Sequence, residues 1–76
     1  MSFNTDLTNE LNLLSQFNLM NEQDGIKIHN DASSSLIAAA EQLHNKGLIT
    51  QKDGGYLTDL GRKAAEHTQA LSSILK

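Results

Sequence analysis

The sequence predicts a mainly α-helical domain that carries one small β-hairpin. Apolar residues recur at spacings of three and four near the start of the chain and again from residue 36 to 43, which is the pattern of one helix face. The turn sequence Asp53-Gly54-Gly55 separates two short apolar segments and supplies the positive φ angles that a tight hairpin needs. The chain has 76 residues and no proline, so we expect a single domain over residues 1–76.

The first predicted helix covers residues 6–17. Thr5 is expected to cap it, and Asp6 suits the positive end of the helix dipole. After a segment without clear periodicity and an Asp24-Gly25 turn, residues 26–29 alternate apolar and polar, which predicts a short half-buried strand. The buried face of the helix is expected to hold the apolar residues Leu7, Leu11, Leu13, Leu14 and Phe17.

The second predicted helix covers residues 31–46. Asn30 or Asp31 is expected to cap it. Lys46 lies in its last turn and Gly47 is a strong stop signal. Its first turn holds three serines, Ser33, Ser34 and Ser35, and its buried stripe holds Leu36, Ile37, Ala40 and Leu43.

The third predicted helix covers residues 58–75, after a hairpin over residues 48–57. Thr58 is expected to end the return strand by capping this helix, with Asp59 at the helix start. The end of the helix, residues 71–75, is apolar enough to need cover. That cover comes either from the first helix or from a second copy of the chain.

Composition and charge exclude several classes of function. The net charge is −3, and residues 1–31 hold five acidic residues against one lysine, so the chain does not coat nucleic acid. The first six residues lack the basic and apolar regions of a signal peptide, and no apolar run is long enough to span a membrane. Cysteine is absent, which fits the reducing cytoplasm, where we expect the protein.

We expect neither a metal site nor catalysis. The histidines His29, His44 and His67 do not form pairs at metal-ligand spacing. The three serines lack a readable partner base, so they read as small polar residues at a helix start, where free N–H groups can also hold phosphate. The sequence contains no phosphate loop or dinucleotide fingerprint, and we expect no cofactor and no small-molecule ligand.

The segments 43–50 and 53–62 resemble the helix end, wing and helix start of winged-helix transcription regulators in the MarR and PadR groups. The shared pattern includes Lys46-Gly47-Leu48-Ile49 and Asp53-Gly54-Gly55-Tyr56, with one residue missing between Tyr56 and Leu57. Taken whole, the chain resembles a small bacterial family of uncharacterised proteins described as DNA-binding, through residues 10–17, 25–32 and 46–62. The resemblance implies a winged-helix-like fold, mainly α with a small β-hairpin wing.

One departure from the winged-helix pattern concerns the segment before the wing. Winged-helix regulators place two helices between the first strand and the wing, whereas only 17 residues separate His29 from Gly47 here. That length holds one helix of about four turns or a very cramped pair. The role of helix 31–46 as a recognition helix is therefore open.

Two functions remain as expectations. The first is a dimeric DNA-binding protein, acting as a transcriptional regulator, in which helix 31–46 approaches the groove and the wing 48–57 touches the backbone. The alternative is a protein–protein interaction module on a degenerate winged-helix scaffold that does not bind DNA, with the wing edge or the third helix as its contact surface. A homodimer is expected to form through helix 58–75. The residues expected to contact DNA are Ser33, Ser34, Ser35, Gln42, Asn45, Lys46, Lys52, Arg62 and Lys63.

Overall fold

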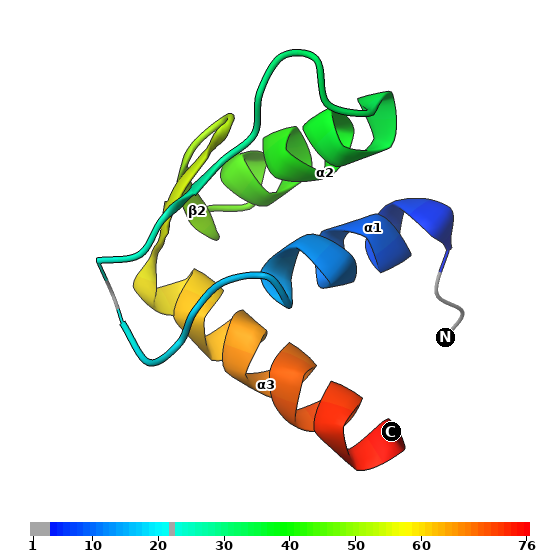
Figure 1. Ribbon diagram of the computed structural model, residues 1–76, viewed down its shortest axis with the longest axis vertical. Coiled ribbons are helices and arrows are strands. Elements are labelled where there is room, and N and C mark those ends of the chain that lie inside the picture. Colours follow the sequence, from blue (N-terminus) through cyan, green and yellow to red (C-terminus); the bar gives the residue numbers. More distant parts are fainter. Residues whose placement is uncertain (1–3, 22) are drawn as a thin grey trace.

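The computed structural model is a small α+β domain (Figure 1). It describes residues 4–21 and 23–76, and residues 1–3 and 22 lie outside this description. The prediction that the first six residues are not a signal peptide therefore falls partly on residues that are not described. Within the described residues there are three helices and one three-stranded antiparallel sheet. No helix in that part of the chain is both long and apolar enough to cross a membrane.

The first helix, α1 (Thr5–Leu14), begins and ends earlier than the sequence predicts. Asn4 caps it in place of Thr5, because the Asn4 side-chain oxygen accepts a hydrogen bond from the amide of Leu7 at 2.8 Å. The chain then tightens into turns up to Phe17, whose amide donates to the carbonyl of Leu14 three residues back. Phe17 nevertheless reaches the core as expected.

The second helix, α2 (Ser34–Asn45), starts three residues later than predicted. Asn30 and Asp31 do not cap it, because the chain makes a turn from His29 to Ala32 first. Ser33 is the N-cap, and its hydroxyl accepts from the amide of Leu36 at 3.2 Å. The described part of residues 18–33 has turns and a short strand, without an additional helix.

The end of α2 is confirmed at Gly47. This glycine has φ of +81°, a conformation that other residues adopt at a cost, and its amide donates to the carbonyl of His44. The amide of Leu48 donates to the carbonyl of Leu43 at 2.9 Å, so the carbonyls of Leu43 and His44 in the last turn have partners beyond the helix.

The predicted hairpin is present as β2 (Ile49–Gln51) and β3 (Gly54–Leu57), but its turn is only Lys52 and Asp53. Gly54 and Gly55, which were predicted as turn residues, lie at positive φ at the start of β3. A third strand, β1 (Ile26–Lys27), is two residues shorter than predicted and pairs antiparallel with β3. The strand order is β1-β3-β2, which places β3 in the middle of the sheet.

The third helix, α3 (Asp59–Leu75), is confirmed with Thr58 as its N-cap. The Thr58 hydroxyl accepts from the amide of Gly61 at 3.0 Å and donates to the carbonyl of Gly47 at 2.6 Å, so one side chain joins the end of α2 to the start of α3. In Figure 1, α3 starts beside the sheet and its C-terminal end lies far from it. The core residues come from all three helices and the sheet region: Leu13, Leu14, Phe17, Ile28, Ala39, Ala40, Leu43, Ile49 and Ala65.

Candidate functional site

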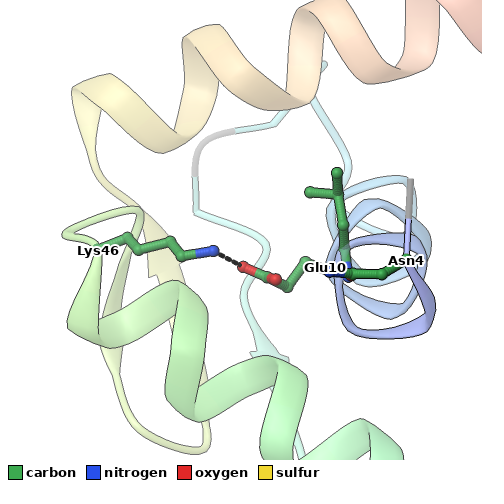
Figure 2. A network of polar contacts seen from close by, with 4 residues as sticks. Asn4, Glu10 and Lys46 are labelled. Carbon is green, nitrogen blue, oxygen red and sulfur yellow. Dashed lines mark hydrogen bonds and ion pairs between the residues drawn. The ribbon is translucent and has the colours of Figure 1, made fainter. Parts of the chain in front are cut away.

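Lys46, an expected phosphate contact, is held in an ion pair. Its ammonium lies 2.5 Å from a carboxylate oxygen of Glu10 on α1 (Figure 2). The Glu10 side chain is only 7% exposed, whereas that of Lys46 is 51% exposed. The lysine therefore compensates a buried negative charge, and its own positive charge is largely cancelled at the surface.

Arg62 is also tied to its own chain. Its guanidinium donates a hydrogen bond of 3.2 Å to the carbonyl of Leu19, so it fastens the loop after α1 to the first turn of α3. It lines a cleft that also contains the carboxylates of Asp24 and Asp59. Lys63, one residue later on α3, is exposed.

Lys52 is exposed in the two-residue turn of the hairpin, in a cleft that also contains Lys27, Glu41 and Asp53. Lys27 on β1 forms an ion pair with Asp53. The hydrogen bond from Lys27 lowers the pKa of the Asp53 carboxyl below its ordinary value, and the positive charge of Lys27 adds to the effect.

The basic residues expected to contact DNA therefore do not gather in one place. Three of them lie in three different clefts, and each cleft also holds two carboxylates. Lys46 is accompanied by Asp6 and Glu10. This arrangement favours the interpretation that the surface carries mixed charges, and it argues against a continuous positive face.

The polar residues of α2 that were expected at DNA separate into three positions. Ser33 is used as the cap, and Asn45 is exposed at the other end of the helix. Ser34, Ser35 and Gln42 line a shallow cleft whose opposite wall is the first half of α1, including the carboxylate of Asp6. This cleft faces another helix of the same chain, so its geometry is less suited to entering a DNA groove than an unobstructed helix face.

The described residues contain no group of three or more His, Cys, Asp or Glu side chains that could hold a metal ion. His44 has its Nδ1 atom buried without a hydrogen-bond partner in the described part of the chain.

The most exposed apolar surface lies on α3, on what we call the α3 outer face, defined by Leu60, Leu71, Ile74 and Leu75. These side chains are 56%, 50%, 78% and 76% exposed, respectively. Leu71 and Leu75 also line a groove between α3 and α1 that includes Leu11. The apolar end of this helix, residues 71–75, was predicted from the sequence, whereas the exposure of Leu60 near its start was not.

The fold and these surfaces define a small α+β domain with one exposed apolar helix face and dispersed charges. The chain belongs to a family of unknown function, DUF5669, whose model matches residues 1–76. No curated protein and no solved structure matches the chain.

Proposed function

We propose that this chain is a protein-interaction module that binds another polypeptide through the α3 outer face. The observation that carries the proposal is the exposure of Leu71, Ile74 and Leu75 in the last two turns of α3, at half to three quarters of each side chain. Covering a fully exposed Leu or Ile is worth about 1.5–3 kcal/mol. Three such side chains at this exposure offer several kcal/mol to a partner before the cost of association is subtracted.

The distribution of charge supports this proposal over DNA binding. Three of the basic residues expected at DNA each share a cleft with two carboxylates, and Lys46 compensates the buried Glu10. A surface of this kind offers phosphates little net attraction, because non-specific DNA affinity depends on cations that release counterions.

The scaffold also supports an interaction role. Like the winged-helix regulators that the sequence resembles, the chain has a hairpin between two helices, with β2 and β3 between α2 and α3. A helix-turn-helix reads DNA with a pair of helices, whereas the described residues between β1 and β2 contain α2 alone. Our proposal therefore treats the scaffold as a degenerate winged helix that lacks one of the two helices of a helix-turn-helix.

The test is affinity capture with the purified chain from an extract of its native host. Wild type and Ile74→Asp are compared, because a charge at position 74 makes the exposed apolar face unfavourable for docking. Ser73→Asp is the matched control, since Ser73 is exposed on another side of the same helix turn. The proposal expects one stoichiometric polypeptide that Ile74→Asp loses and Ser73→Asp keeps. Equal recovery with both variants would overturn it.

DNA binding is the second candidate function, and the exposed hairpin favours it. Lys52 is exposed in the hairpin turn, the part of a wing that would contact the DNA backbone, while α2 would approach the groove. Fluorescence titration of a labelled duplex at about 50 mM salt tests this candidate. It expects binding that weakens steeply with salt and weakens further in Lys52→Met. Absence of binding at low salt, or binding that is insensitive to salt, would exclude it.

A further inference from the structure

The exposed side of α3 carries apolar residues in a regular order. Leu60, Ala64, His67, Leu71 and Ile74 follow one another at spacings of four, three, four and three. This is the spacing at which one helix packs along another in a coiled coil. We call these five residues the α3 stripe. His67 is its central member and its polar one.

The rest of the domain packs against a different side of α3. Gly61 and Ala65 are buried, and Thr68 and Ser72 are half-buried on the same side of the helix. Leu60, His67, Leu71 and Ile74 are exposed, and Ala64 lies at the border between the two sides. The helix thus has one face for its own core and a second, adjoining apolar face that the domain leaves open.

The stripe has nearly the same order in both directions from His67. Leu60 lies seven residues before it and Ile74 seven residues after it, while Ala64 lies three before and Leu71 four after. A surface with this symmetry matches itself across a two-fold axis perpendicular to the helix. We propose that the occupant of the stripe is a second copy of this chain, docked antiparallel with the two His67 side chains facing each other at the axis. This rests on the proposed function and names its partner.

Side-chain size favours the antiparallel arrangement over the parallel one. Antiparallel docking sets the small Ala64 of one copy opposite the large Leu71 of the other, so the two fill one layer. Parallel docking would set Ala64 against Ala64 and leave a gap at that layer. A polar residue at one core position also selects register. The pairing of His67 with itself, which both arrangements allow, keeps both imidazoles away from aliphatic partners and excludes shifted registers.

Charge does not oppose this contact. The acidic residues at the start and middle of α3, Asp59 and Glu66, lie about a third of a turn away from the stripe. Lys63 flanks it, and antiparallel docking separates the two Lys63 positions by about 12 Å along the axis, beyond the screening length of about 8 Å at physiological salt.

The size of the contact predicts its strength. From Leu60 to Ile74 the stripe is about 21 Å long, and it is one helix wide. A strip of this length and about 10 Å wide covers about 200 Å², well below the roughly 800 Å² per partner that a stable interface buries. Leu11 and Leu75 widen the apolar surface at one end. We therefore expect an association that is micromolar or weaker and strongly dependent on concentration.

The first experiment is sedimentation of the full chain from the micromolar to the millimolar range. A monomer that becomes a dimer with rising concentration is expected, and Ile74→Asp is expected to remain monomeric where Ser73→Asp dimerises. Circular dichroism confirms that both variants keep their helices. A wild-type chain that stays monomeric throughout the range overturns the proposal.

The second experiment uses the absence of cysteine in the chain, which lets single cysteines report which positions meet. Under mild oxidation, His67→Cys is expected to form a disulfide-linked dimer and Ser73→Cys is not. Leu60→Cys alone should stay monomeric, because its two copies are about 21 Å apart in the antiparallel arrangement, but it should cross-link when mixed with Ile74→Cys. Disulfide-linked Leu60→Cys homodimers would show a parallel pair and overturn the proposed arrangement.

The two levels of the proposal fail in different ways. A monomeric chain that still captures a different polypeptide, lost in Ile74→Asp, overturns the second copy as partner while the interaction function stands. A monomeric chain that captures nothing overturns both.

Discussion

We expect substitutions at the two members of the Glu10–Lys46 ion pair to lower the free energy of unfolding by unequal amounts. Lys46→Met keeps most of the aliphatic stem but leaves the Glu10 carboxylate, 7% exposed, without its cation. Removing one partner of a fully buried pair costs about 3–5 kcal/mol. Because Lys46 is 51% exposed, solvent already screens the attraction, and we expect about 2 kcal/mol.

Glu10→Gln is expected to cost less, below about 1 kcal/mol. The neutral amide can still accept a hydrogen bond from Lys46, and the lysine is exposed enough to be hydrated when its counter-charge is gone. The pair thus stabilises the fold mainly by neutralising a carboxylate that the packing of α1 against α2 has buried.

Urea unfolding followed by the helical circular dichroism signal measures both variants. A domain of this size has a total stability of about 4–11 kcal/mol and an m-value of about 1 kcal/mol/M. Lys46→Met should therefore lower the unfolding midpoint by about 2 M and Glu10→Gln by less than half as much. Lys52→Met, a change at an exposed lysine, controls for the loss of a positive charge. Equal shifts for the two variants of the pair, or no shift for Lys46→Met, would refute the reasoning.

Three further predictions concern other contacts. Asp53→Asn should make stability fall less steeply in acid. The lowered pKa of Asp53 stabilises the fold above the ordinary pKa of the carboxyl, and this stabilisation disappears as the pH falls below about 4. A pH series of urea midpoints checks this, and an unchanged acid profile would contradict it. Gly61→Ala should cost about 3 kcal/mol or more, since its Cβ would lie 1.8 Å from the carbonyl oxygen of Leu48, and a thermal midpoint close to that of wild type would show that the backbone yields. Gln69→Leu should cost about 1 kcal/mol, because it removes the side-chain amide that donates to the carbonyl of Phe17 at 2.8 Å. Backbone amide hydrogen exchange at the end of α1 should become faster. Unchanged exchange there would refute the role of Gln69 in holding the end of α1.

Features that depend on neighbouring residues were predictable from the sequence. The hairpin follows from Asp53-Gly54-Gly55, the stop of α2 from Gly47, and the start of α3 from Thr58. Each of these acts on backbone groups within a few positions, so local chemistry alone decides them.

The wrong helix starts show where local chemistry leaves a choice. Asn4 and Thr5 are both capable caps for α1, as are Asp31 and Ser33 for α2. The turn from His29 to Ala32 decides the second case, and it lies where the chain leaves β1. The choice between two possible cap residues therefore depends on how the sheet positions the chain, and the sequence pattern alone does not show this.

The candidate site depended on contacts between distant segments. Glu10 and Lys46 are 36 positions apart, so the sequence showed Lys46 as a free cation near a helix end. The apolar end of α3 was visible, but which of its sides the core would use was not. That choice leaves Leu60 and Ile74 exposed while Ala65 is buried.

The strand order has a consequence for how the chain folds. The strands β2 and β3 are adjacent in sequence and can pair within microseconds, whereas Ile26 meets Gly55 only after a loop of 29 positions, which contains α2, has closed. The outer strand β1 is therefore expected to join the sheet late, after the hairpin and α2 have formed. Weakening it would then speed unfolding far more than it slows folding, so that β1 governs how long the folded domain persists.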